Sequence, residues 1–197
     1  MGVDTKKLRN RIKSVDSTLH LTTAMGLVAS SKIRKAMDAM LKSREYAESI
    51  GQVVKNLAGC KECEKSPYMV QRSEGKTCII VIAGDRGLAG GYNSNIAKLV
   101  LASGYAKENV RLYTIGKKGA DILSRKGYHI AENYADVIEE PTFEDAKRVG
   151  NRLLQDYMDG EIGEIYVAYT EFKNTVVQIP KMIKLLPVDK TEATENA

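Results

Sequence analysis

The chain has 197 residues, of which 43% are hydrophobic and 28% are charged, a balance typical of folded rather than disordered proteins. This length suits one globular domain with some additional residues, or two small domains. The longest apolar run, residues 78–83, is far shorter than the roughly 20 residues of a membrane-spanning helix. Residues 1–14 are polar and lack the apolar core of a signal peptide, so we expect neither a membrane span nor secretion by that route.

The net charge of +5 is distributed unevenly along the chain. Residues 1–59 contain 11 lysines and arginines against 5 acidic residues, whereas residues 60–197 contain 19 against 20. The excess of positive charge therefore belongs to the N-terminal third. The cysteines, Cys60, Cys63 and Cys78, are odd in number, so we expect a reducing compartment and no disulfide framework.

Residues 1–59 are predicted to form one long coiled-coil shaft helix. The segment 4–57 contains no proline and has only Gly26 and Gly51 as interior glycines, which is typical of a helix. Apolar residues recur in 4-3 alternation, the spacing that lines one side of a coiled-coil helix. We call this row the seam, and its candidate residues are Leu8, Ile12, Val15, Leu19, Ala29, Ile33, Met40, Ile50, Val54 and Leu57. From Leu8 to Leu57 such a helix would be about 75 Å long, so we expect it to protrude.

The middle of the seam is lined by the small residues Thr22, Gly26 and Ala29, whereas both ends carry large side chains. Small residues would let the backbone of a partner helix approach closely. Alternatively, Gly26 is only a local weakness that costs about 1 kcal/mol relative to alanine. The sequence leaves both interpretations open.

Residues 60–76 are predicted to be a polar connector, residues 77–188 an α/β domain, and residues 189–197 a loose tail. Within the α/β domain, strand and helix patterns alternate. We predict strands at 77–83, 110–115 and 164–170, helices at 93–102, 118–125 and 142–160, and extended chain at 175–186. Thr142 and Asp145 have the spacing of a capping box. This alternation predicts a small doubly wound, Rossmann-like α/β sheet that is mostly parallel.

A glycine-rich turn between the first strand and the next helix occupies the place where phosphate-binding loops occur. Its residues include Asp85, Arg86, Gly87, Gly90 and Gly91. Their spacing matches neither the dinucleotide-binding fingerprint nor the P-loop, and the Asp85 carboxylate would repel an anion. We predict a structural turn, with a small nucleotide-binding protein that dimerises through its helix as the alternative.

The remaining chemically interesting residues do not form a recognisable site. Cys60 and Cys63 form a single Cys-x-x-Cys pair in the connector, and zinc would need two further ligands, whereas His20 and His129 are far away in sequence. We predict ordinary loop cysteines, with a redox dithiol as the alternative, although thioredoxin-type pairs lie between a strand and a helix rather than in a connector. The adjacent Glu139 and Glu140 precede a predicted helix and suit its dipole better than acid–base chemistry. We therefore predict no catalytic residue, no cofactor and no metal.

The basic residues at the start of the helix resemble, at first sight, the basic region of a DNA-binding zipper. However, Leu8, Ile12 and Val15 already occupy seam positions within this basic stretch. One face of the stretch is therefore committed to packing, and we predict no nucleic-acid binding.

Several motifs, taken together and in order, resemble the gamma subunit family of the rotary ATP synthases. Residues 8–15 and 21–25 resemble the family pattern R-I-x-S-V followed by I-T-K-A-M, and residues 28–36 resemble V-A-A-S-K-x-R-K-A. Residues 84–93 are similar to S-D-R-G-L-C-G-G-x-N. The segments 115–119, 172–180 and 185–187 follow in the family's order, so the resemblance extends to about Pro187.

The resemblance implies a non-catalytic rotor subunit in the central stalk of an ATP synthase. In that family the long helix pairs antiparallel with a C-terminal helix, and this shaft turns inside a hexamer of alpha and beta subunits. The α/β domain binds the epsilon subunit and the membrane c-ring. Ion flow through the ring thereby changes the catalytic sites of the hexamer. The implied location is peripheral, at the cytoplasmic face of a bacterial plasma membrane.

Individual residues can be matched to family positions. Met25 matches a methionine that faces the beta subunits, and the resemblance implies that Lys32, Arg34 and Lys35 could meet acidic loops of the hexamer. Asp85 and Arg86 match the architectural glycine turn.

The sequence also departs from the family pattern. Thr23 and Ala89 replace a usual lysine and cysteine, and no second long helix follows Pro187. We therefore expect the seam to need a partner, the family's C-terminal helix. A non-coupling homologue whose helix self-associates is the structural alternative.

Overall fold

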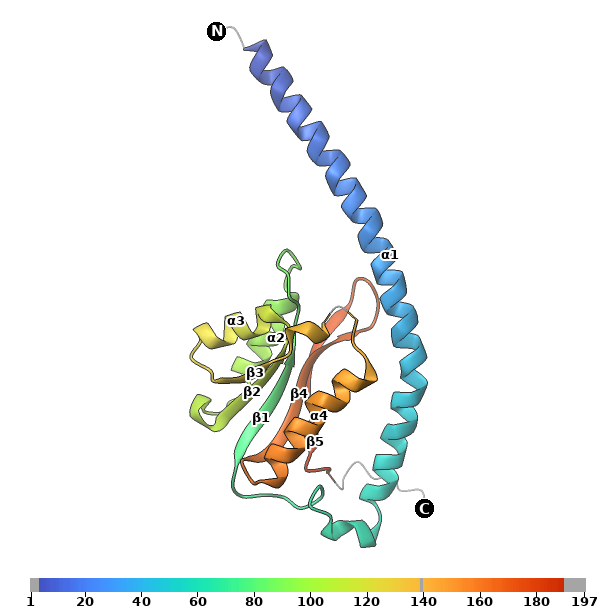
Figure 1. Ribbon diagram of the computed structural model, residues 1–197, viewed down its shortest axis with the longest axis vertical. Helices are drawn as coiled ribbons and strands as arrows, with labels where there is room; N and C mark the ends of the chain where they lie inside the picture. Colours follow the sequence, from blue (N-terminus) through green and yellow to red (C-terminus); the bar gives the residue numbers. More distant parts are fainter. Residues whose placement is uncertain (1–3, 139, 190–197) are drawn as a thin grey trace. The chain divides into compact units, whose positions relative to one another are not determined.

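The computed structural model describes residues 4–138 and 140–189 (Figure 1). The chain divides into two units, residues 1–54 and residues 55–197. The first consists of most of one helix, and the second contains the end of that helix, the connector and a sheet with its covering helices.

Helix α1, Thr5–Ala58, is continuous and confirms the predicted long helix. Its first turn is capped by Asp4, whose carboxylate accepts hydrogen bonds from the backbone amides of Lys6 and Lys7, both at 3.2 Å. Its 54 residues correspond to about 80 Å of helix. Hydroxyl groups that would otherwise compete with the helix donate back to carbonyls of the preceding turn, as Thr18 does to Ser14 at 2.9 Å.

The sheet of the second unit has five strands in the order β3-β2-β1-β4-β5. The strands are β1 (Lys76–Ile82), β2 (Val110–Ile115), β3 (Ile130–Asn133), β4 (Ile162–Phe172) and β5 (Gln178–Leu186). The pairs of β1 with β2, β1 with β4, and β2 with β3 are parallel, and only β5 runs antiparallel, beside β4. This arrangement confirms the predicted α/β class and the mostly parallel sheet.

Helices α2 (Tyr92–Leu101) and α3 (Lys117–Arg125) cover one face of the sheet, and α4 (Phe143–Met158) covers the other (Figure 1). The central strand β1 is buried on both faces because its side chains alternate between the two layers. Ile79 and Val81 pack with the α2 and α3 layer, whereas Cys78 and Ile80 pack with α4.

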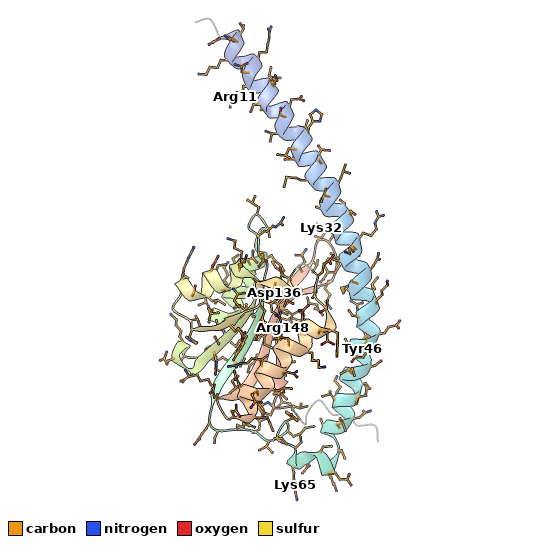
Figure 2. All side chains as sticks on the ribbon, viewed as in Figure 1. Arg11, Lys32, Tyr46, Lys65, Asp136 and Arg148 are labelled. Carbon is orange, nitrogen blue, oxygen red and sulfur yellow. The ribbon has the colours of Figure 1, made fainter. Side chains whose placement is uncertain are left out.

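Helix α4 begins with the predicted capping box. The Thr142 hydroxyl accepts a hydrogen bond from the Asp145 amide, and the Asp145 carboxylate accepts one from the Thr142 amide. Just beyond the cap, Arg148 of α4 pairs at 2.7 Å with Asp136 of the 3-10 helix η3 (Ala135–Val137). Both residues are labelled in Figure 2. These contacts join the start of α4 to the segment that precedes it.

The connector is more ordered than its polar sequence indicates. It contains the 3-10 helix η1 (Lys61–Lys65), and its second half is fixed to α4 and to the chain just after β5. The Tyr157 hydroxyl donates to the Pro67 carbonyl at 3.1 Å, the Arg72 guanidinium lies 3.9 Å from the centre of the Tyr157 ring, and the Val188 amide donates to the Tyr68 carbonyl at 2.8 Å.

Other differences from the sequence prediction concern short elements. Strand β3 was not predicted, because its four residues include Glu132 and Asn133, which favour strands weakly, and it forms by pairing with β2. A further 3-10 helix, η2 (Lys107–Asn109), precedes β2. The predicted extended segment 175–186 becomes a strand only from Gln178, because the Asn174 side chain accepts hydrogen bonds from Val176 and Val177 in a turn. The predicted tail lies, from residue 190 onward, outside the described residues.

Candidate interaction surface

All ten predicted seam residues lie on α1, and nearly all of them are exposed. Leu8, Ile12, Val15 and Leu19 have half or more of their surface exposed, and with Arg11 and Asp16 they line a shallow apolar groove. Met40 is the one seam residue that is partly covered. Such a row of large apolar side chains at the surface of a monomer marks an interaction site.

The seam also winds slowly around the helix. A strict heptad row drifts by about 20° per heptad on a straight helix, so it stays on one side of a partner only if the two helices supercoil. Between Leu8 and Leu57 the accumulated drift is on the order of 140°. The geometry of α1 therefore suits a left-handed coiled coil rather than a flat docking surface.

The four residues matched to hexamer contacts do not share one face of α1. At about 100° per residue, Met25 and Lys32 lie within about 20° of each other, and Lys35 lies about 60° further round. Arg34 lies on the opposite side, about 160° from Lys32. The helix thus groups Met25, Lys32 and Lys35 and separates Arg34 from them (Lys32 is labelled in Figure 2).

Two apolar residues extend this group and were not singled out in the sequence. Leu21 and Val28 are 61% and 58% exposed, and their positions relative to Met25 continue the 4-3 spacing on a second row beside the seam. We call this row the flank, and its residues are Leu21, Met25, Val28, Lys32 and Lys35. A search for a second heptad row, offset from the first, would have found it. The flank is apolar at its N-terminal end and basic at its C-terminal end. It therefore suits a partner surface that is partly apolar and partly charged.

The glycine-rich turn between β1 and α2 is tied internally and to the neighbouring turn between β2 and α3. The Asn93 side chain accepts from the Gly84 amide at 2.8 Å and donates to the Arg86 carbonyl at 3.1 Å. The Asp85 carboxylate accepts from the Lys117 amide at 2.8 Å, at the start of α3. The amides of Gly84 and Lys117 are therefore paired within the protein, and a carboxylate occupies the N-terminus of α3. A structural turn stays our prediction for these residues.

Glycines allow the two turns to approach each other. A Cβ at Gly116, where φ is +97°, would lie 2.1 Å from the Ala83 carbonyl oxygen, and a Cβ at Gly119 would lie 2.9 Å from the Ala83 Cβ. By contrast, Gly87, Gly90 and Leu88 lie at the open side of the loop, and Leu88 is fully exposed with φ at +58°. The interior of the turn is therefore fixed by packing.

A charged network lies between α4 and β2. Asp156 is buried, accepts a hydrogen bond from the Tyr113 hydroxyl, and forms ion pairs with Arg111 at 3.5 Å and Arg152 at 3.3 Å. Burial, reinforced by the Asp156 hydrogen bond, raises the pKa of Tyr113 to about 12. Because every charge in the network has an opposite partner, it reads as a structural anchor for α4 rather than as an acid–base site.

The other sequence candidates remain separate. His20 lies on exposed α1 beside Asp16 at 3.7 Å, and Glu139 lies outside the described residues. Among residues 4–138 and 140–189, no cluster of three or more histidine, cysteine or acidic residues could hold a metal ion. None of the helices in this part of the chain has the length and apolar character needed to cross a membrane.

Comparison with known proteins gives a consistent result. The sequence matches the protein family described as ATP synthase over residues 4–197. It is 42% identical over 191 residues to an ATP synthase gamma chain of Lachnoclostridium phytofermentans, a match that covers 97% of this chain and 66% of the relative. It is 41% identical over 196 residues to the sodium ion specific ATP synthase gamma chain of Acetobacterium woodii, covering 98% of this chain and 64% of that one.

A further relative, the ATP synthase gamma chain of Alkaliphilus metalliredigens, is 36% identical over 197 residues, and this chain covers 68% of it. Among solved structures, the central stalk and c-ring of the Tetrahymena thermophila mitochondrial ATP synthase contains a chain with the same fold. That match has a TM-score of 0.68 and 24% identity, and it covers 90% of this chain and 79% of the other.

The chain spans about two thirds of the length of the curated relatives that it matches. The shared sequence includes both the long helix with its seam and the α/β sheet with its glycine turn. The chain belongs to the ATP synthase gamma chain family.

Proposed function

We propose that this chain acts as a central-stalk rotor subunit of an ATP synthase. In this role it couples ion flow through the membrane c-ring to conformational change in the catalytic hexamer of alpha and beta subunits. The observation that carries the proposal is the continuous helix α1 with its exposed seam, because a transmitter of torque needs a long, stiff element that other helices can grip. The chain itself contributes no catalytic residue in this scheme.

The seam is the surface on which the shaft is completed. A second long helix, the family's C-terminal helix, packs antiparallel against the seam and buries its large residues at both ends. In the middle, Gly26 has open space beside its Cα, and Ala29 is small, so the second backbone can come close there.

The flank is the surface that meets the hexamer. Its apolar residues Leu21, Met25 and Val28 lie beside the seam and stay accessible when the seam is covered. Its basic residues Lys32 and Lys35 then attract acidic loops of the alpha and beta subunits. The α/β domain binds the epsilon subunit and the c-ring, which places the protein peripherally at the cytoplasmic face of a bacterial plasma membrane.

The test is assembly of the chain with its partners. The chain would be expressed together with the alpha, beta and epsilon subunits of the Lachnoclostridium phytofermentans relative and with a peptide of that gamma chain's C-terminal helix. We expect a complex that contains the chain, and we expect Ile33→Asp combined with Ile50→Asp to abolish it, because a charge in the seam cannot be buried.

The matched control is Leu27→Asp. Leu27 is large and 71% exposed, but it lies away from both the seam and the flank. This variant should assemble as the unchanged chain does. Normal assembly of the Ile33→Asp, Ile50→Asp variant would refute the role of the seam.

Self-association of α1 is the second candidate, and the same exposed seam favours it. Two copies could pair antiparallel through their seams and form a non-coupling dimer. Light scattering of the purified chain separates the two functions, since the dimer has twice the mass of the monomer. A dimer that persists in the presence of the peptide would favour this second candidate.

A further inference from the structure

Cys60 and Cys63 lie close together in the turn that directly follows α1. The Cys63 amide donates to the Cys60 carbonyl at 3.1 Å, which closes a turn over four residues and continues into η1. Turns of this kind hold the first and fourth Cα atoms within about 7 Å, and residues three apart in a 3-10 helix stack above one another. This separation lies inside the range that a disulfide can bridge.

The two side chains also influence each other, because Cys63 lowers the pKa of the Cys60 thiol and Cys60 raises the pKa of the Cys63 thiol. Both side chains are half-buried, so a small reagent can reach them. The sequence predicts ordinary loop cysteines, with a redox dithiol as the alternative. The successive turns from the end of α1 into η1 favour the alternative, because they hold the two residues in one turn.

The immediate surroundings make the two thiols unequal. The backbone amides of Glu62 and Cys63 lower the pKa of the Cys60 thiol, as does the hydrogen bond from the Cys63 thiol. Partial burial and the neighbouring Cys60 raise the pKa of Cys63. The lower pKa of Cys60 favours it as the nucleophile of the pair, with Cys63 as the partner that attacks second.

The chain contains its own reference thiol. Cys78 on β1 is fully buried, and burial raises its pKa to about 12. It should be inert as long as the sheet is folded. Any reaction at Cys78 consequently reports unfolding rather than chemistry of the connector.

We propose that Cys60 and Cys63 form a thiol–disulfide exchange site, which reacts with a disulfide-bearing molecule and closes an intramolecular disulfide in the connector. This inference concerns a modification of the chain and does not depend on the proposed rotor function. The oxidised form would hold by a covalent bond a turn that is now held by hydrogen bonds.

The reaction proceeds in two exchange steps. The Cys60 thiolate attacks one sulfur of the external disulfide, a Cys60–sulfur bond forms, the external sulfur–sulfur bond breaks, and one external thiolate leaves with the electron pair and takes up a proton. Cys63 then loses its proton and attacks the Cys60 sulfur, which forms the Cys60–Cys63 bond and releases the second external thiolate, which is protonated in turn. The protein dithiol is oxidised, and the external disulfide is reduced to two thiols.

The experiment incubates the full, reduced chain with oxidised glutathione and, in a separate arm, with an oxidised thioredoxin, and follows its mass. We expect the chain to lose two hydrogen atoms without retaining an adduct. Cys63→Ser should trap one mixed disulfide on Cys60, and Cys60→Ser should react at least about tenfold more slowly. Cys78→Ser is the matched control and should behave as the unchanged chain. Reaction only with glutathione identifies a small-molecule oxidant, and reaction only with thioredoxin identifies a protein oxidant.

Alkylation of the native chain gives a second readout, with the expected order of rates Cys60, then Cys63, then Cys78. Protection of Cys78 also verifies that each variant is folded. The proposal is overturned if neither disulfide reacts, if the unchanged chain accumulates a stable adduct or a disulfide between two chains, or if Cys60→Ser and Cys63→Ser react equally fast.

Discussion

Helix α1 and the α/β domain differ in how far they bury their large apolar side chains. In the domain, large apolar residues such as Leu112 and Ile79 are fully buried between sheet and helices. On α1, residues of the same kind, such as Ile33 and Leu41, are about half exposed. A large apolar residue in this chain therefore has one of two purposes. In the domain it stabilises the fold, whereas on α1 it stays exposed, and we propose that it binds a partner.

The largest contrast should appear when one substitution is made in both regions. Leu112→Ala in β2 should lower the free energy of unfolding by about 3 kcal/mol, because it leaves a cavity in a fully buried layer. Leu41→Ala on α1 should change it by less than about 0.5 kcal/mol. Urea unfolding followed by tyrosine fluorescence measures both free energies. Tryptophan is absent from the sequence and Tyr46 is the only tyrosine on α1, so nearly all of the signal comes from the rest of the chain. Equal effects would mean that α1 contributes to the stability of the domain.

The second largest loss of stability should follow substitution at the contact between the two glycine-containing turns of the domain. Gly116→Ala should cost at least about 2 kcal/mol, because the new Cβ would meet the Ala83 carbonyl and φ is positive. Gly90→Ala is the matched control: φ is +55° there but the surrounding space is open, so its cost should stay near 1 kcal/mol. The two variants are compared by thermal unfolding. A Gly116→Ala protein as stable as Gly90→Ala would contradict the role given to close packing.

Charges on α1 should affect assembly but not folding. Lys32→Glu combined with Lys35→Glu on the flank should weaken binding to the alpha and beta subunits by about tenfold, mainly by slowing association, and added salt should reduce the difference. Arg34→Glu, on the other side of the helix, should have a clearly smaller effect. Binding kinetics at two salt concentrations measure this. If Arg34→Glu weakened binding as strongly, the flank would not be the contacting surface.

The smallest expected effect concerns the cap of α4 and its dependence on pH. Hydrogen bonds from Thr142 lower the pKa of Asp145, so the folded state favours the charged carboxylate. The stabilisation is fully present above the ordinary aspartate pKa of about 4 and is lost as the pH falls through the lower folded value. Unfolding measured from pH 7 downward should therefore show a slightly steeper loss of stability for the unchanged chain than for Asp145→Asn. Identical curves would show that the cap does not depend on charge.

Much of the fold could be predicted from the sequence because it depends on patterns of residues that are close together along the chain. The absence of proline from residues 4–57, the 4-3 spacing of the seam and the Thr142–Asp145 box each involve residues within one or two helical turns of each other. Strand β3 has no such pattern, and it exists because β2 offers it a parallel edge. For the candidate site, the motif matched Met25, Lys32, Arg34 and Lys35 as one group, but only helix geometry separates Arg34 and adds Leu21 and Val28.

The sequence by itself determined the long helix, its seam, the alternation of strands and helices, and the family. Only the tertiary structure decided how the Asp85 and Gly116 turns interlock, that Asp156 is paired with Arg111 from another element, and that Cys78 is shielded. The physical reason is the separation along the chain of the residues that determine each feature. Periodicity and capping depend on neighbours along the chain, whereas burial, close backbone approach and charge pairing depend on segments that meet only after folding.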